Sequence, residues 1–392
     1  MSAGNAGNGN GSNTNGNGGS RLHGAIETYF RLAPVTVPIY AVLVAVVVGS
    51  LVMLLAGANP LTAYGALFDG AWGSPEVLAR SLARSTPFII AGLAVAFAFK
   101  AGLFNIGAEG QLLMGALTAA WVGTWSWMAG LPAILAVPVV LLAGVAGGLF
   151  WGGIPGVLKA RTGAHEVIVT IMLNAIALRL AEWIINSRSP RILLDLSASV
   201  PHTVPIFDAA RMPRLPGTAL HLGFLLALLL CAAVWFVLQR STVGFEIRTV
   251  GANPDAARYA GMSVGRTIVL VMAVSGALAG IAGAGEVSGG TTGYLTSGSF
   301  IGIGFDSIAI ALLARANPFA VIPAAFLWGS LLAGAPTMQL QADVSLDIVR
   351  VVQALIILFV AADAIVRWLF RIRAPRDGDI TTGEVFAKGW GT

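Results

Sequence analysis

Residues Ala101–Leu117 read Ala-Gly-Leu-Phe-Asn-Ile-Gly-Ala-Glu-Gly-Gln-Leu-Leu-Met-Gly-Ala-Leu, and they place Asn105, Glu109 and Gln111 between two apolar runs. An ionised carboxylate in the hydrocarbon of a bilayer is costly unless it faces protein or water. The four glycines of this stretch allow close helix contacts or a broken helix that lines a cavity. The stretch therefore predicts a substrate or ion pathway inside a membrane.

The composition indicates a polytopic membrane protein. Of the 392 residues, 56% are hydrophobic and only 10% are charged, whereas a soluble domain has about 25% charged residues. The net charge of +5 comes mostly from arginines without interleaved aromatic residues, which fits anionic lipid headgroups and not nucleic acid. Cys231 is the only cysteine and His165-Glu166 has no second histidine four residues on, so we predict no disulfide, metal site or other cofactor.

The fold class that we predict is all-α. With about 17 to 25 apolar residues per membrane span, the sequence predicts ten transmembrane helices, at residues 35–57, 86–103, 106–128, 131–156, 166–186, 219–239, 267–287, 300–316, 319–336 and 348–370. Ten spans place both termini on one side, and the arginine-rich short loops mark that side as cytoplasmic. Arg80 and Arg84 depart from this rule, and we assign them to a short amphipathic helix at the outer interface.

The chain divides into three regions. Residues 1–34 begin with a Gly, Asn and Ser stretch that predicts a disordered cytoplasmic tail. Residues 35–370 form the transmembrane domain, and residues 371–392 form a cytoplasmic tail. Within the domain, residues 187–218 are predicted as an external loop and residues 240–266 as a cytoplasmic loop.

A faint internal repeat appears when Ile106–Gln111 is laid over Ile303–Ile308. Glu109 and Asp306 then occupy the same place after an Ile-Gly pair. Repeats of this kind frame midplane sites in transporters. Chance is the alternative explanation, because Ile-Gly is common in a membrane chain with 49 glycines.

The chain carries no phosphate-binding loop of the Gly-x-x-x-x-Gly-Lys-Ser/Thr type. Its three lysines, Lys100, Lys159 and Lys388, do not follow a glycine, so ATP hydrolysis, if it drives this protein, must occur on another polypeptide. The segment Gly244–Arg266 fits a docking site for such a partner, since Asn253-Pro254 is typical of a helix start. A solvated connector with ordinary caps is the alternative.

Two stretches resemble the hallmark segments of ABC-importer permeases for branched-chain amino acids, simple sugars and nucleosides. These are Phe104–Gln111 and Gly251–Met262, and the resemblance extends over about residues 35–370. The first stretch is most similar to the nucleoside-type members. The Asp-Leu-Ser-Val-Gly stretch that ribose-type relatives carry is absent.

The resemblance implies a permease subunit of a bacterial importer in the plasma membrane, without enzymatic activity of its own. It implies three partners, namely a second related permease, two ATPase subunits and an extracytoplasmic binding protein of the basic-membrane-protein type. It also implies an ATPase-coupling helix, whose candidate residues are Gly251, Asn253, Ala256, Ala257, Arg258, Tyr259 and Gly261. Arg258 and Tyr259 are the expected contacts.

Six residues are candidates for the substrate path, where polar groups would bind ribose hydroxyls or base edges and an aromatic ring would stack. They are Phe104, Asn105, Glu109, Gln111, Asn174 and Asp306. The alternative for the polar members is interhelical hydrogen bonding worth roughly 0.6 kcal/mol each. Sugars or branched-chain amino acids remain alternative substrates, and an ion-coupled transporter using Glu109 or Asp306 and a non-transporting scaffold remain alternative classes.

Overall fold

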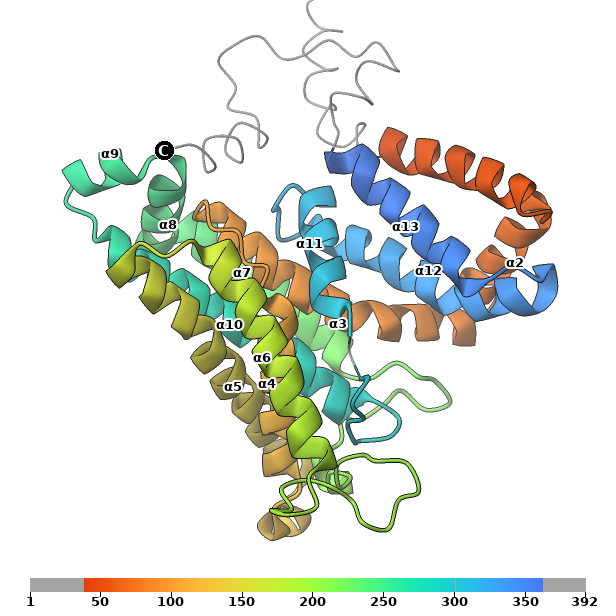
Figure 1. The fold of residues 1–392 in the computed structure, drawn as a ribbon, viewed down its shortest axis with the longest axis horizontal. Coiled ribbons are helices and arrows are strands. Elements are labelled where there is room, and N and C mark those ends of the chain that lie inside the picture. Colours follow the sequence, from red (N-terminus) through yellow and green to blue (C-terminus); the bar gives the residue numbers. More distant parts are fainter. Residues whose placement is uncertain (1–38, 300, 362–392) are drawn as a thin grey trace, which may run out of the picture.

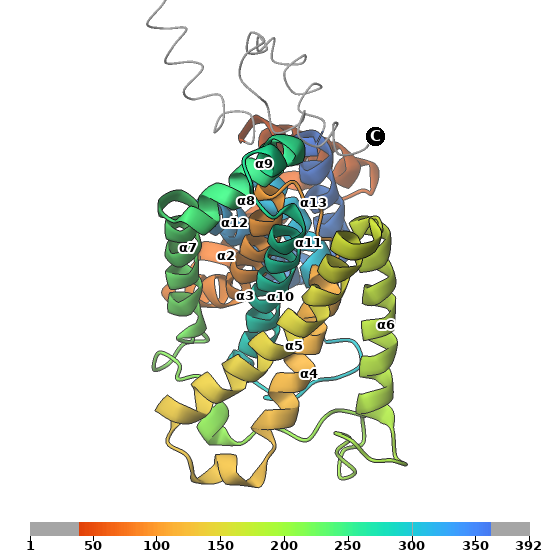
Figure 2. The same cartoon turned by 90° about the vertical axis from the view of Figure 1, so that its left-hand side faces the viewer.

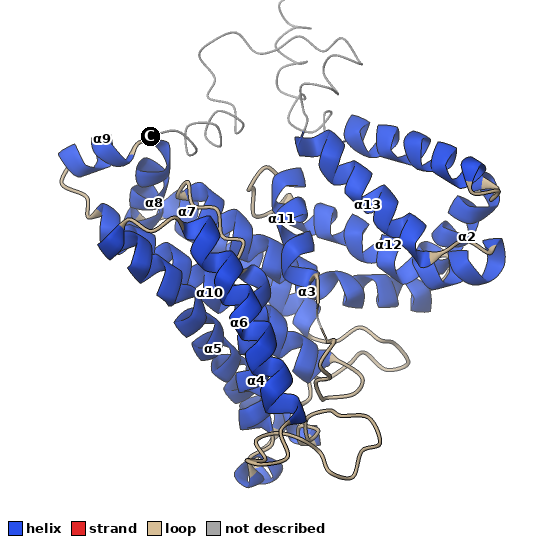
Figure 3. Ribbon diagram, viewed as in Figure 1, coloured by secondary structure: helices blue, strands red, loops and turns tan. Residues whose placement is uncertain are grey.

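The computed structural model describes residues 39–299 and 301–361. Within these ranges the chain forms α-helices and short 3-10 turns joined by loops, and no β-strand occurs in them (Figure 3). The all-α prediction is confirmed. The two predicted tails, residues 1–34 and 371–392, lie outside the described ranges.

The first helix described is Ile39–Leu55. The helices that follow it are, in chain order, α2 Pro60–Trp72, α3 Pro75–Lys100, α4 Ala108–Gly123, α5 Ala133–Thr162, α6 Glu166–Asn186, α7 Gly223–Arg240, α8 Thr242–Ala252, α9 Pro254–Tyr259, α10 Val264–Gly289, α11 Ile303–Leu313, α12 Val321–Ala342 and α13 Leu346–Ala361. Short 3-10 turns occur at Ser126–Gly130 and Asp208–Ala210.

Six of the described helices are long and apolar enough to cross a membrane. They are α3, α5, α6, α7, α10 and α12, while Ile39–Leu55 and α11 are apolar but shorter. The predicted last span reaches residue 370, beyond the described part of α13. The number of ten spans therefore stays a prediction.

The region before residue 130 differs from the prediction. An additional helix, α2, begins at Pro60, where the Asn59 side chain accepts a hydrogen bond from the backbone of Leu61. Helix α3 begins at Pro75 and continues to Lys100. Arg80 and Arg84 lie on α3, so the separate amphipathic helix predicted for them is wrong. The two arginines lower the local hydropathy, so the apolar pattern did not indicate that these residues form the first turns of a long helix.

Helices α4, α5 and α10 make the most extensive contacts, and glycines allow their backbones to meet. A Cβ added at Gly148 of α5 would collide with the carbonyl oxygen of Gly276 of α10, and one at Gly115 of α4 would collide with the backbone of Gly280. We call this three-helix contact the glycine seam; its residues are Gly115, Gly144, Gly148, Gly152, Gly276, Gly280 and Gly283. Small residues at such crossings let membrane helices pack closely.

Helix α3 joins two groups of helices. Figure 1 shows α4 to α7 and α10 on one side of it, and α2, α12, α13 and Ile39–Leu55 on the other. α3 contacts α10 in the first group and α12 in the second, and it also contacts α11. Helix α6 stands at the edge of the first group (Figure 2), where its main contacts are with α4 and fewer are with α5.

The two predicted loops lie at opposite ends of the molecule (Figure 1). Residues 187–218 contain only a 3-10 turn and pair with the α10–α11 connection, since Thr203 N donates to Leu295 O and Ile206 N donates to Gly293 O, each at 2.9 Å. The predicted loop 240–266 contains α8 and α9. The structure shows opposite ends, and the assignment of each end to a side of the membrane stays a prediction.

Candidate functional site

The break between α3 and α4 is held together by Asn105, whose side chain is fully buried. Its Nδ2 donates to Gln111 Oε1 at 2.9 Å and to Ser275 Oγ on α10 at 2.8 Å. Its Oδ1 accepts from the backbone N of Gly107 at 3.0 Å. Ser275 Oγ in turn donates to Ala94 O on α3 at 2.7 Å. Polar backbone groups freed by a helix break must find partners inside the protein, and this cluster supplies them.

Asn174 of α6 closes the same break from the other side. Its Oδ1 accepts from Gly110 N and its Nδ2 donates to Ile106 O, both at 2.9 Å. One side chain therefore satisfies a donor in the first turn of α4 and an acceptor just before it. This pair of bonds fixes α6 against the start of α4.

Glu109 of α4 binds the start of α11. Its Oε1 accepts from the backbone N of Gly302 at 2.6 Å, and its Oε2 accepts from that of Gly304 at 2.7 Å. A carboxylate at a helix N-terminus is stabilised by the free N–H groups and by the helix dipole. Gly304 packs so tightly on the backbone of Glu109 that an added Cβ would collide with it. The two segments of the suspected repeat are therefore in contact, although the duplication itself stays a prediction.

Phe104 and Asp306 are half-buried on either side of this junction. The Phe104 ring lies 5.2 Å from that of Phe99, measured between centroids. Asp306 is in the first turn of α11, with its backbone N donating to Gly302 O at 2.8 Å.

The structure thus gathers the predicted path residues around the start of α4. Asn105, Gln111 and Asn174 are buried and hydrogen-bonded to protein, which fits the interhelical alternative. Glu109 and Asp306 keep partial exposure. Their place on a substrate path stays a prediction.

The predicted coupling segment folds into a short helix, α9. Asn253 Oδ1 accepts from Asp255 N and Ala256 N, both at 3.0 Å, and Pro254 occupies the first turn. Gly261 has a φ of 81°, which favours glycine in the turn after the helix. Tyr259 is 95% exposed. α9 therefore presents an aromatic side chain that no residue in the described ranges covers.

The remaining predicted coupling residues divide into buried and exposed positions. Ala257 is buried against the protein, Ala256 is exposed, and Arg258 is exposed with its Nη1 3.1 Å from Asp255 Oδ1. Gly251, at the end of α8, packs on the end of α3: a Cβ there would collide with the carbonyl oxygen of Lys100. The segment is thus attached to the same break that holds the predicted path residues.

Sequence reasoning missed Arg179. It is the only charged residue of α6 between Glu166 and Glu182, and a lone arginine inside a membrane span is itself a signal of function. Sequence reasoning also missed the backbone N–H groups of Gly302 and Gly304, which no residue-type pattern identifies.

The described residues contain no group of three or more His, Cys, Asp or Glu that could hold a metal ion. Glu166 forms an ion pair within the chain, since its Oε2 lies 2.6 Å from Lys159 Nζ.

Residues 77–361 match the family described as the permease component of the branched-chain amino acid transport system. The chain belongs to this permease family. It is therefore a multi-pass membrane protein, as its apolar helices also indicate.

This permease resembles several characterised relatives. It is 42% identical to the guanosine ABC transporter permease NupP of Bacillus subtilis, over 86% of this chain and 96% of that protein. It is 34% identical to the nucleoside permease NupB of Lactococcus lactis, over 90% and 97% of the two chains. It is 35% identical to the glucose permease TsgB13 of Haloferax volcanii, over 82% and 86%. No solved structure matches this permease.

Proposed function

We propose that this permease is the membrane subunit of a bacterial importer that takes up nucleosides. The observation that carries the proposal is the 42% identity to a guanosine permease along nearly its whole length. The nucleoside permease NupB supports the same substrate class. The chain does no covalent chemistry in this function; it binds, orients and moves its substrate.

The proposal includes the partners that such an importer needs. ATP is hydrolysed on separate ATPase subunits that bind α9, because a nearly fully exposed Tyr259 beside a capped helix suits burial in a protein groove. A second related permease completes the path, and a binding protein delivers the substrate at the opposite end, near residues 187–218. Both termini and α9 face the cytoplasm.

Glucose is the second candidate substrate, since TsgB13 is 35% identical over most of both chains. Uptake of labelled guanosine, uridine and glucose in cells with and without this permease separates the two. Nucleoside uptake that needs the permease, and that ATP depletion abolishes, supports the proposal. Uptake of glucose alone moves the assignment to sugars, and loss with an ionophore while ATP is preserved indicates ion coupling.

The ATPase contact has a test of its own. Tyr259→Ala and Arg258→Ala should each weaken co-purification of the ATPase, since buried Tyr and Arg contacts contribute about 2 kcal/mol or more, roughly a 30-fold change in affinity. Arg188→Ala, an exposed arginine of the loop 187–218, is the control. Equal ATPase recovery with the wild type and both α9 variants would contradict the docking site.

A further inference from the structure

Helix α6 exposes one continuous stripe along its length. Its exposed residues are Ile168, Ile171, Met172, Ala175, Ile176, Arg179, Trp183 and Asn186, which we call the open face of α6. With 3.6 residues per turn, Arg179 lies near the centre line of this stripe, opposite the side on which Asn174 binds α4. No described helix covers it.

Arg179 is far inside the helix. It precedes the end of α6 at Asn186 by seven residues, about 10 Å, and follows its start by about 20 Å. Its side chain is 77% exposed, and its Nη1 lies 2.7 Å from Glu182 Oε2. An exposed ion pair facing lipid at this depth would leave most of the guanidinium donors without partners.

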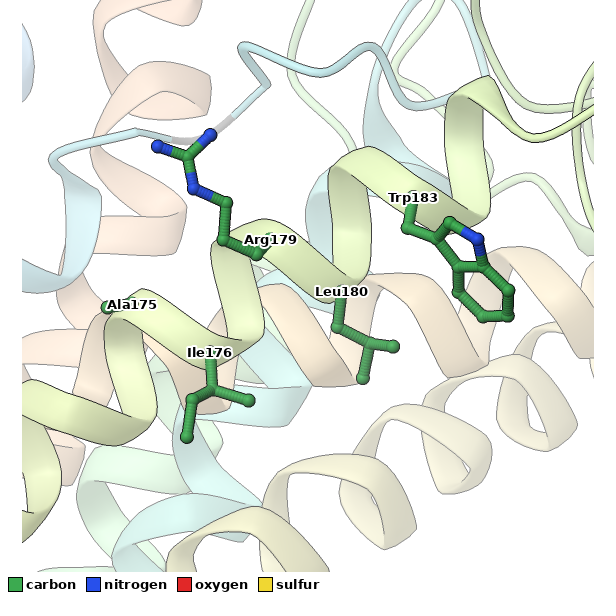
Figure 4. Close-up of a pocket in the computed structure, with 5 residues that line it drawn as sticks. All are labelled: Ala175, Ile176, Arg179, Leu180 and Trp183. Carbon is green, nitrogen blue, oxygen red and sulfur yellow. The ribbon is translucent and has the colours of Figure 1, made fainter.

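The residues around the pair form a shallow groove of about 490 Å³. It is lined by Ala175, Ile176, Arg179, Leu180 and Trp183. Figure 4 shows the Arg179 side chain extending to one side of α6, and Ile176, Leu180 and Trp183 extending to the other. The groove surface is therefore apolar and aromatic, and the Arg179 guanidinium extends away from it along the same helix.

Helix α5 of the same fold offers an exposed apolar surface for comparison. Helix α5 exposes Ile134, Leu142 and Phe150, and it has no charged residue before Lys159. The open face of α6 differs from it by carrying Arg179, which pairs with Glu182, and Asn186.

We propose that the open face of α6 lines the water-filled translocation path and that Arg179 and Glu182 bind the nucleoside there. This inference rests on the proposed function. Guanidinium N–H groups not used by Glu182 can donate to base carbonyl, ring nitrogen or ribose oxygens, and the carboxylate can accept from hydroxyl or amino groups. The pair has no net charge, which suits a neutral ligand better than a phosphate.

Thiol labelling tests whether the open face of α6 is exposed to water. Ala175→Cys and Ile176→Cys are compared with Leu142→Cys and Phe150→Cys on α5, in the assembled transporter, with a charged membrane-impermeant methanethiosulfonate reagent. The native Cys231 is fully buried and serves as background. Because the thiolate is the reactive form and needs water, the α6 variants should label about tenfold faster or more, and guanosine should slow them.

Two results would overturn the inference. Labelling on α6 as slow as on α5 in every preparation indicates a lipid-facing stripe. Labelling that is fast in the isolated permease, slow in the assembled transporter and insensitive to guanosine indicates that a helix of the second permease covers the face.

Transport tests the ion pair itself. At guanosine concentrations well below saturation, Arg179→Gln should lower the uptake rate about tenfold, the effect of losing one charge-assisted hydrogen bond to the substrate. Arg179→Lys should retain a higher uptake rate than Arg179→Gln, since the lysine ammonium group can also donate hydrogen bonds. Arg80→Gln, an exposed arginine on α3, is the control. Unchanged uptake in Arg179→Gln would overturn the nucleoside contact. If the wild type carries glucose and no nucleoside, the proposed function fails, and labelling alone decides whether the face is wet.

Discussion

At the scale of the residue, Glu109 joins two helices that are far apart in the chain. Its two carboxylate oxygens accept from the backbone of Gly302 and Gly304, so the start of α11 is fixed to the start of α4. Asn105 and Asn174 serve the break before α4 in the same way, by satisfying backbone groups.

Replacing Glu109 should destabilise the protein. Glu109→Ala removes both bonds and leaves two N–H groups without a partner, so we expect the free energy of unfolding to fall by about 2 to 3 kcal/mol. Glu109→Gln keeps one accepting oxygen, so its free energy of unfolding should fall by less than that of Glu109→Ala. Thermal melting of the purified permease measures the difference. Asp69→Ala, at an exposed position of α2, is the control, and equal melting of Glu109→Ala and wild type would contradict this role.

The sequence singled out the polar residues at this junction as candidates for a substrate path and did not predict the partners that they bind inside the protein. The depth of Glu109 in an apolar stretch was sufficient to single it out, and the amides around it followed from the same pattern. Their partners are mostly backbone N–H and C=O groups, which every residue carries. Only the three-dimensional arrangement reveals them.

At the scale of the element, the glycine seam lets α4, α5 and α10 approach until their backbones touch. Dispersion contacts and weak Cα–H hydrogen bonds replace side-chain packing at such crossings. Any side chain at the seam would separate the helices.

Two glycines of α10 give a matched test of this packing. Gly276→Ala puts a Cβ into the backbone of α5, whereas Gly285→Ala meets nothing within 4 Å. We expect Gly276→Ala to cost about 1 to 3 kcal/mol of stability and Gly285→Ala to be neutral or slightly stabilising, because alanine favours helices. Denaturant or thermal unfolding of both variants checks the difference; equal stability would show that the seam can open without cost.

Long apolar helices were predictable and short ones were not. The apolar run at residues 166–186 gave α6 its observed bounds, because a span must cover the bilayer. The hydropathy criterion did not detect α2 and α8, since helices of 13 and 11 residues are too short to span a bilayer. Proline and asparagine caps, which act locally, did predict α9.

At the scale of the whole molecule, a line of contacts connects α9 with α11. α8 carries α9 and packs through Gly251 on the end of α3; a Cβ at Gly102 would also lie 3.2 Å from Gly251 O. The break after α3 leads to Glu109 and so to α11. Rigid elements in contiguous contact can carry a movement between distant sites.

Weakening the α8–α3 contact should uncouple ATP hydrolysis from nucleoside uptake. Gly251→Ala forces α8 away from Lys100, so we expect ATPase binding to persist while nucleoside uptake falls about tenfold or more. Gly265→Ala, whose added Cβ meets only an ordinary contact at 3.7 Å, is the control. Hydrolysis and uptake are measured on the same reconstituted transporter. Retention of full uptake by Gly251→Ala would show that this contact transmits nothing.

The hydrogen bond between Glu109 and Gly302 can form only late in the biosynthesis of the chain. The two residues are 193 positions apart, and a ribosome adds about 5 to 20 residues per second, so roughly 10 to 40 s pass between the synthesis of the carboxylate and that of its partner. During this interval α4 carries an acid with no helix start to neutralise it. Because an ionised carboxylate in hydrocarbon is costly, we expect this carboxyl group to stay hydrated or protonated until α11 has been made.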